Sequence, residues 1–454
     1  MTVVDSEDLH RLVKLAMDTG EARSIEHARD IFAGYRIGVA VGPEIEWSAS
    51  HQAALLTFLR LASRVFLGGV DVAFTAGAVP NLIPGNPGIA ETMTKVGARR
   101  VTTLEPYVPA VCIGSVEMPP TAGFAVRAVF SGWRAGVVPV HSSPPFSFET
   151  EFTLTGALAA ALAVSEAFLF VRRDTPEAGL RQVGLSLWRP DAGNEWWTSG
   201  NDGPRIVYLP SKLWLLGLGH LGQAYLWALA LLPYERPEEV MLVLQDTDAI
   251  TNATLSTSIL SEPTMIGRKK ARAMAALMEV RGFRTAIIER KFDETTRVLP
   301  DDPQIALCGL DNALGRRPLC EVGFKFVVEA GLGKGVKDFR AIRIHTFPGT
   351  KDPRELWKPL EERDVNVDTP AYDDLRARGL DQCGVTLLAG RAVGASFVGM
   401  TTAVFCLGEI LRLLHGGQPF ALHDLDLKVP SGLTSIPRKS GLGPFNPGFV
   451  GARL

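Results

Sequence analysis

The chain has 454 residues, of which 46% are hydrophobic and 21% are charged, a balance typical of soluble globular proteins with two or three domains. Its formal net charge of -2 provides no field that would attract nucleic acid or an anionic membrane, so nucleic acid is not an expected partner. The N-terminus has no cationic start followed by an apolar region, which predicts a cytoplasmic protein.

Apolar strands that end in glycine begin the first half of the chain. The predicted strand is 36–42, and it is followed by two apolar blocks over 109–116 and 123–136 and by an alanine-rich stretch over 156–168. Residues 189–204 are polar and broken by Gly and Pro between two apolar halves, which is typical of an inter-domain linker.

Two apolar stretches, which begin at 152 and at 392, are long enough to resemble membrane spans. Each carries a glutamate, Glu166 in the first and Glu409 in the second. Because a span of roughly 20 residues should be uncharged, both stretches predict buried helices packed on a sheet, and no membrane partner is expected.

Strands and helices alternate through the second half. The predicted strands are 212–219, 239–246, 285–292, 304–310 and 324–331, and the predicted helices are 221–232, 267–280 and 391–415. This alternation predicts an α/β fold with doubly wound, Rossmann-like, mostly parallel sheets. Ligands on such sheets lie beyond the carboxyl ends of the strands, which is where the loops at Gly217, Asp246 and Asp311 fall.

The two halves resemble each other in four blocks that recur in one order. One block is an alanine-rich helix in which glutamate follows glycine by ten residues, Gly156 and Gly399 being the two glycines. Shared order favours a duplicated domain, although any two α/β domains share such features. The second copy has about forty extra residues. The predicted divisions are 1–204 for the first domain and linker, 205–430 for the second domain with its insertion at 345–386, and 431–454 for a Gly/Pro-rich tail, either an extended arm or disordered.

A three-glycine loop at 213–226 carries Gly217, Gly219 and Gly222 between a strand and a helix. Such glycines let the backbone approach phosphate oxygens at a helix N-terminus, for a dinucleotide and for ATP alike. Asp246, which follows Gly222 by 24 residues, can hydrogen-bond a ribose hydroxyl in either ligand. The loop and this aspartate are compatible with NAD and with ATP.

Two further residues favour ATP. Lys270 begins a predicted helix, where an ammonium can reach polyphosphate, although a basic run such as 268–272 is usually a solvated surface. Asp311 follows the strand over 304–310, with Asn312 next to it. A carboxylate beside triphosphate is a plausible ligand of Mg²⁺, which proteins hold by one or two carboxylates together with phosphate oxygens.

These motifs resemble the active adenylation domain of the ubiquitin-activating (ThiF/MoeB-type) adenylating enzyme superfamily. The resemblance covers 205–425 and includes the glycine loop, "DTD" at 246–248, "GRKKA" with Lys270, "LDNALGR" from Leu310, and the cysteine and glycine-rich helix from Cys383. It implies that Gly217, Gly219 and Gly222 cradle ATP, that Asp246 holds the ribose, that Lys270 binds phosphate and that Asp311 coordinates Mg²⁺. It also implies that Asp248, Asn252 and Asn312 contact the nucleotide.

One position departs from the family. The family usually has arginine where this chain has Thr257, so a positive charge beside the phosphates is missing. Asn252 or an arginine from the first half is expected to substitute. Arg29 resembles the arginine that the partner domain contributes in this family, with Arg23 and Arg36 as rivals.

The first half resembles the inactive partner domain of the same superfamily. Its strand ends at Gly42 without the further glycines, and Ser115 stands where the second half has Asp311. Since neither change suits Mg-ATP, we expect this half to complete a two-fold contact with the active half.

Cys383 is the predicted nucleophile. It lies at the end of the insertion, in a segment expected to be exposed, before a helix N-terminus that would favour the thiolate. The remaining cysteines, in apolar contexts, are predicted to be core residues: Cys112, Cys308, Cys320 and Cys406.

The resemblance therefore implies ATP-dependent adenylation of the C-terminus of a ubiquitin-like protein, then a thioester on Cys383 and transfer to a conjugating enzyme. It is nearest to bacterial ubiquitin-like conjugation systems of antiviral defence, in which a metallopeptidase is a further partner, and it leaves a homodimer open. The absence of C-x-x-C pairs argues against the zinc-containing sulfur-carrier adenylyltransferases without excluding them. The sequence is also compatible with a non-catalytic scaffold derived from this family and with a nicotinamide-dependent oxidoreductase.

Overall fold

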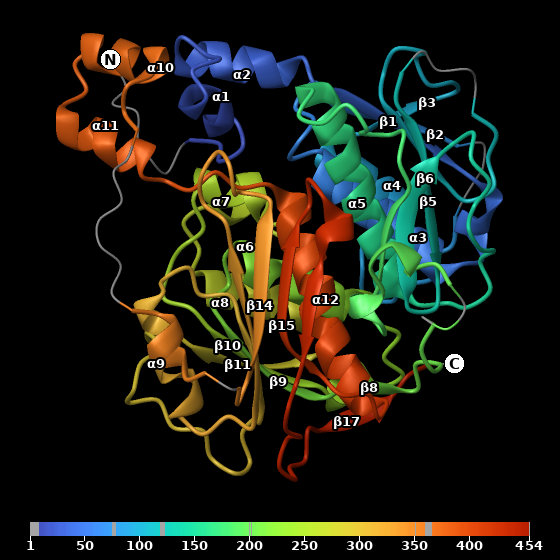
Figure 1. Ribbon diagram of the computed structural model, residues 1–454, viewed down its shortest axis with the longest axis vertical. Helices are drawn as coiled ribbons and strands as arrows, with labels where there is room; N and C mark the ends of the chain where they lie inside the picture. The colour runs from blue at the N-terminus through green and yellow to red at the C-terminus, as the bar shows by residue number, and fades with distance from the viewer. Residues whose placement is uncertain are drawn as a thin grey trace.

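The computed structural model describes residues 9–74, 79–118, 123–198, 200, 202–349, 351–358 and 366–453. Two α/β units, each built on one twisted sheet, make up the molecule (Figure 1). Both sheets are parallel in their first part and antiparallel at one edge. The predicted fold class is therefore confirmed.

The first sheet has seven strands in the order β3-β2-β1-β4-β5-β6-β7. The strands are β1 (Arg36–Val41), β2 (Gly69–Ala73), β3 (Arg99–Val101), β4 (Ala110–Ile113), β5 (Ala125–Ser131), β6 (Arg134–Pro139) and β7 (Val183–Ser186). The first five pair in parallel, whereas β6 and β7 are antiparallel to their neighbours.

The second sheet repeats this order with an additional edge strand, as β11-β10-β9-β12-β13-β14-β15-β16. The strands are β9 (Lys212–Leu216), β10 (Met241–Gln245), β11 (Arg284–Ile288), β12 (Ile305–Cys308), β13 (Phe326–Leu332), β14 (Ala341–Phe347), β15 (Phe420–Asp426) and β16 (Thr434–Pro437). Seven strands thus share both order and direction between the halves, which supports the duplication that the repeated blocks predict.

Four helices form the contact between the two units: α3 (Ala49–Ala62), α5 (Thr153–Arg172), α6 (His220–Leu231) and α12 (Ser396–Leu414). The helices α5 and α12 lie side by side there, with the rings of Phe168 and Phe397 5.7 Å apart (Figure 1). Trp227 on α6 donates from Nε1 to Thr57 Oγ1 on α3 at 3.0 Å. The core is therefore continuous from one half to the other.

By length and composition alone, α5 and α12 are apolar enough to cross a membrane, but their apolar windows are 89% buried inside the fold. Their glutamates are satisfied within it. Glu166 accepts from Arg181 at 2.5 Å, and Glu409 accepts from His423 Nε2 at 2.8 Å and from the Phe420 amide at 2.7 Å. These contacts explain how a carboxylate is tolerated in each buried helix.

The remaining helices are short. They are α1 (Lys14–Asp18), α2 (Ile25–Ala33), α4 (Ile89–Val96), α7 (Asn252–Thr257), α8 (Lys270–Glu279), α9 (Pro353–Leu356), α10 (Pro370–Ala377) and α11 (Gln382–Ala389). At the top of Figure 1, α1 and α2 lie beside α10 and α11, from the opposite end of the chain. Tyr372 donates to Asp18 Oδ1 at 2.5 Å, and the buried Lys14 ammonium donates to the Ala389 carbonyl at 3.0 Å.

The predicted linker and tail both pack on the body of the protein. Trp196, from the segment 189–204, is 2% exposed and fills the space over Gly184, where a Cβ would lie 2.2 Å from its ring. In the tail, β17 (Phe449–Gly451) pairs antiparallel with β8 (Tyr208–Pro210). Residues 350 and 359–365 of the predicted insertion, and residues 199 and 201 of the linker, lie outside the described residues.

Candidate active site

The three-glycine loop forms a tight turn between β9 and α6. Gly217 has φ of +82°, a conformation that side chains rarely adopt. A Cβ on Gly222 would lie 2.0 Å from the Gly217 carbonyl oxygen, so only glycine lets α6 pack this closely on the turn. A Cβ on Gly219 would meet nothing within 4 Å, so the backbone there is open to a ligand.

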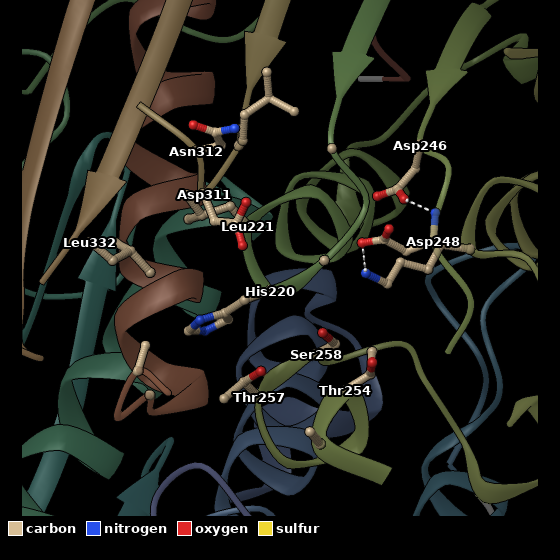
Figure 2. A pocket seen from close by; sticks show the side chains of 18 of the residues that line it. His220, Leu221, Asp246, Asp248, Thr254, Thr257, Ser258, Asp311, Asn312 and Leu332 are labelled. Atoms are coloured by element: carbon tan, nitrogen blue, oxygen red, sulfur yellow. Dashed lines mark hydrogen bonds and ion pairs between the residues drawn. The ribbon is translucent and has the colours of Figure 1, made fainter. Parts of the chain in front are cut away.

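This turn borders a cavity of about 640 Å³, which we call the nucleotide cavity. Predicted site residues that line it are Gly217, Gly219, Asp246, Asp248, Lys270, Asp311 and Asn312. Figure 2 shows Asp246 and Asp248 on one side of the glycine turn and Asp311 and Asn312 on the other, with the His220 ring below Asp311. Gly222 supports the turn from behind, and Asn252, exposed at the start of α7, does not line the cavity.

The acidic pair after β10 is held in place by the turn and by Lys270. Asp246 accepts from the Leu218 amide at 2.6 Å and from the Asp248 amide at 2.7 Å, and burial raises its pKa. Lys270 Nζ donates to Asp248 Oδ2 at 2.9 Å. Partial burial opposes ionisation of Asp248, but this lysine holds the pKa of Asp248 below its usual value. Lys270 thus lines the cavity, and Asp248 holds its ammonium group in place.

Arg316 fixes the opposite side of the cavity. Its Nε donates to the Leu310 carbonyl at 2.8 Å, and its Nη1 lies 2.7 Å from a carboxylate oxygen of the buried Glu329. Lys334 Nζ donates to the Asp311 carbonyl at 3.0 Å. The backbone before and at Asp311 is therefore held by two cations. The Asp311 carboxylate itself is exposed and makes no hydrogen bond or ion pair within the described part of the chain.

The cavity is suited to a metal ion only if a bound molecule supplies some of the metal ligands. Among the described residues, no group of three or more His, Cys, Asp and Glu side chains is arranged to hold a metal ion. Mg²⁺ is commonly held by one or two carboxylates and phosphate oxygens, so the unengaged Asp311 carboxylate suits a metal that arrives with a nucleotide. The residues present therefore fit Mg-ATP.

The arginine that reaches the cavity from the first half is Arg11, which sequence reasoning missed. Its amide donates to Ser256 Oγ on α7 at 3.1 Å, and its side chain lines the cavity near Thr257. Arg29 instead lies exposed on α2 and does not line the cavity. Nothing in the sequence singles out Arg11, because it meets α7 only through the fold.

The rivals of Arg29 are also outside the cavity. Arg23 is exposed, and Arg36 lies 2.8 Å from carboxylate oxygens of Asp71 and Glu105.

The segment 390–394 also lines the cavity, although the sequence predicts a helix from 391. The helix α12 begins only at Ser396. Before it, the Val393 amide donates to the Lys334 carbonyl at 2.9 Å, and Gly394 lies so close to Thr257 that a Cβ would be 3.0 Å from its Cγ2. These contacts keep the segment extended as a wall of the cavity, which joins it directly to the element that carries Cys383.

In the first half, a carboxylate occupies the corresponding glycine turn. Glu44 accepts from the Ser115 amide at 2.9 Å, and a Cβ on Gly42 would lie 2.5 Å from its Oε2. Partial burial opposes ionisation, but the bonds from Ser115 lower the pKa of Glu44. A negative charge therefore already lies where the second half leaves room for phosphate, which supports the expectation that the first half does not bind Mg-ATP.

Cys383 lies outside the nucleotide cavity. It is exposed, as the sequence predicts, and lies on α11, whose N-cap Asp381 accepts from the Gly384 amide at 2.8 Å. Cys112, Cys308 and Cys406 are buried, and burial raises the pKa of Cys308 to about 12. Cys320 is half-buried, and burial raises its pKa also to about 12. Cys383 is thus the accessible thiol among the five.

Comparisons with known proteins cover both halves. The family described as "BilD N-terminal domain" matches residues 36–187, and the family described as "BilD C-terminal domain" matches residues 209–417. A protein of Collimonas sp. (strain OK412), named "Bacterial E1-like protein BilD", is 43% identical over 421 residues, which are 92% of this chain and 91% of that protein.

Solved structures are similar at much lower identity. PaaA is 14% identical, with a TM-score of 0.35 over 50% of this chain and 72% of that chain. E. coli MccB with MccA-N7isoASN is 12% identical, with a TM-score of 0.34 over 71% of this chain and 97% of that chain. At these values we draw nothing about the site from either structure.

Proposed function

The chain belongs to the BilD family of bacterial E1-like proteins, and on this premise we propose that it adenylates the C-terminal carboxylate of a ubiquitin-like protein with ATP. The observation that carries the proposal is the convergence of Lys270, Asp311 and the three-glycine turn on one cavity of about 640 Å³. Together these groups supply what adenylyl transfer from ATP needs: backbone amides, a cation and a free carboxylate. An oxidoreductase would leave Lys270 and Asp311 without a role.

The chain's own groups divide the work of binding ATP. Backbone amides at the open Gly219 and the N-terminus of α6 receive phosphate oxygens, and Lys270 offsets charge that develops as pyrophosphate leaves. Asp246, already fixed by two amides, presents its carboxylate to the ribose. Asp311 would hold Mg²⁺, which when bound neutralises the phosphates and orients them.

In this proposal, Arg11 supplies the positive charge that is missing at Thr257, where the family usually has arginine. Both residues line the cavity, and Gly394 packs between them: its Cβ would lie 3.0 Å from Thr257 Cγ2 and 3.8 Å from Arg11 Cβ. Arg11, from the first half, therefore lies close to the position at which the family usually has arginine. This arrangement makes the first half a contributor to the site and not a support alone.

In the second step the Cys383 thiolate attacks the acyl-adenylate. A C–S bond forms, the acyl–phosphate bond breaks and AMP leaves with the electron pair, which gives a thioester for transfer to a conjugating enzyme. Cys383 is exposed and joined to the cavity through the segment 390–394. A metallopeptidase that removes the modifier, a cytoplasmic location, and a place in antiviral defence complete the proposal.

The test is exchange of labelled pyrophosphate into ATP, measured with ubiquitin-like proteins of the source bacterium. Exchange should require an intact modifier C-terminus and should be abolished in Asp311→Asn, whereas the exposed Asp301→Asn should exchange at the normal rate. A modifier that binds without any exchange would instead support the non-catalytic scaffold, and exchange that survives in Asp311→Asn would contradict the assigned metal ligand.

A further inference from the structure

A second cavity, of about 360 Å³, lies between the two halves and shares no lining residue with the nucleotide cavity. We call it the arginine cavity. Its charged lining residues are Arg60, Glu91 and Lys95 from the first half and Glu262 and Arg281 from the second. Its volume falls within the range of small-molecule sites, about 300–1,000 Å³.

Arg60 on α3 enters the cavity with much of its hydrogen-bonding capacity unused. It is 4% exposed, and its guanidinium carbon lies 4.7 Å from the centre of the Trp227 ring. The one described hydrogen bond of its guanidinium group is a long one, from Nη1 to the Ile259 carbonyl at 3.4 Å. Nε is enclosed without an acceptor, and Nη2 has none among the described residues.

Arg281, just beyond α8, approaches from the other half. It is 8% exposed, donates from Nε to Asn86 Oδ1 at 3.0 Å, and donates from Nη1 to the Leu277 carbonyl at 2.6 Å. Its Nη2 has no acceptor in the part of the chain that the structure describes. Two buried guanidinium groups, one from each half, thus each keep a terminal nitrogen for a ligand in the cavity.

The cavity is also short of negative charge. Buried Arg64 lies behind it and donates only to carbonyl groups, those of Arg60, Ser258, Ile259 and Ser261. No described carboxylate oxygen lies within 4.0 Å of Arg60, Arg64 or Arg281. Both acidic residues of the cavity face Lys95 instead, Glu91 at 3.3 Å and Glu262 at 3.6 Å.

The incompletely compensated charge has an energetic consequence. Burial, assisted by the nearby charge of Arg60 and opposed by Glu262, lowers the pKa of Arg281 to about 10 and of Arg64 to about 9. These groups stay protonated at neutral pH, so their desolvation is a cost, and Glu262 offsets only part of it. An anion in the cavity would offset it, and guanidinium groups bind phosphate oxygens well.

We propose that the arginine cavity binds a small phosphate anion of the size of pyrophosphate, held by Arg60 and Lys95 from one half and Arg281 from the other. Such an anion bridges the two halves, so its binding stabilises their contact. The site is separate from the nucleotide cavity and does not depend on the function proposed above.

Calorimetric titration with inorganic pyrophosphate, without Mg²⁺, tests the proposal in the full chain. The variant Lys270→Gln serves as the background, because it removes the cation that the proposed function assigns to phosphate in the nucleotide cavity. Arg281→Gln added to this background should raise the dissociation constant at least tenfold, and Lys95→Gln should raise it severalfold. Arg284→Gln changes an exposed arginine outside the cavity and should leave the dissociation constant unchanged.

Lys95 is 39% exposed, so its variant keeps the test decisive if Arg281→Gln fails to fold. Pyrophosphate should also raise the melting temperature of the background and of Arg284→Gln, but not of Arg281→Gln. The proposal is overturned if the background binds no pyrophosphate at millimolar concentration, or if Arg281→Gln and Lys95→Gln both bind it as tightly as Arg284→Gln. Acetate that binds equally well would overturn the assignment to phosphate.

Discussion

His220 fills the space that the absent side chain of Gly399 leaves, since a Cβ on Gly399 would lie 2.3 Å from His220 Nε2. His220 is the first residue of α6, and Gly399 is in the first turn of α12. The first half has the same arrangement, because a Cβ on Gly156 of α5 would lie 2.2 Å from the carbonyl oxygen of Ser50 on α3. In each half this glycine, Gly156 or Gly399, thus leaves room for the first residues of another helix. That helix is α3 after β1 in the first half and α6 after β9 in the second.

Gly399→Ala should therefore disturb the nucleotide cavity. The added methyl group must displace His220 and with it the glycine turn, at a cost of about 1–3 kcal/mol in the free energy of unfolding. Pyrophosphate exchange should fall with it. Gly408→Ala on the same helix is the control, because its Cβ would meet Leu187 at an ordinary 3.5 Å. Equal stability of the two variants in denaturant unfolding would contradict this interpretation.

His220 should also make stability depend on pH. Burial lowers its pKa from 6.5 to about 4, so the folded protein binds this proton less readily than the unfolded chain. The stabilising contribution is complete above pH 6.5 and is lost as the pH falls towards 4. Unfolding free energies measured between these values should fall less steeply for His220→Gln than for the natural protein. His10, whose pKa is also lowered to about 4, titrates equally in both proteins.

Arg11→Ala should slow adenylation by about 100-fold while the protein remains folded, because it removes one cation aimed at the phosphates. Arg29→Ala is the matched control, since this arginine is exposed outside the cavity and should leave the rate unchanged. Initial rates of pyrophosphate exchange at saturating ATP provide the measurement. A loss confined to Arg29→Ala would restore the arginine that the sequence favours.

Cys383→Ala should retain pyrophosphate exchange and lose the thioester, because the thiol takes part only after adenylation. The thioester is measured as a modifier adduct that reductant cleaves on a denaturing gel. Cys320→Ala should keep both activities, as burial raises the pKa of that thiol to about 12. An adduct that persists in Cys383→Ala would move the nucleophile elsewhere.

Glu44→Ala tests whether the first half is a blocked nucleotide site or one that lacks the means to bind. Stability should fall by about 1 kcal/mol with loss of the bonds from Ser115. Equilibrium dialysis should still find one ATP per chain, because Ser115 cannot replace the carboxylate of Asp311. Two bound nucleotides in this variant would show that Glu44 alone keeps ATP out.

The sequence predicts which residues lie together wherever those residues directly follow a strand. Gly217, Asp246 and Asp311 each follow an apolar run, and parallel strands bring their carboxyl ends to one edge. Contacts between segments that lie far apart in the chain could not be predicted from the sequence. Arg11 contacts Ser256, which is 245 positions away in the chain. Because Arg29 is also an arginine that precedes the first strand, the sequence alone does not distinguish the two. The helix expected from 391 starts later, because the preceding residues pack as a cavity wall against Thr257.

The continuous core between α5 and α12 means that the halves are not separable units. Their windows of highest apolarity, with mean hydropathy of 1.9 and 1.6, cover each other through contacts such as Phe168 against Phe397. Expressed alone, either half would present such a surface to water and to its own copies. Insoluble fragments are the consequence, and work on the isolated adenylation half requires a redesigned apolar face.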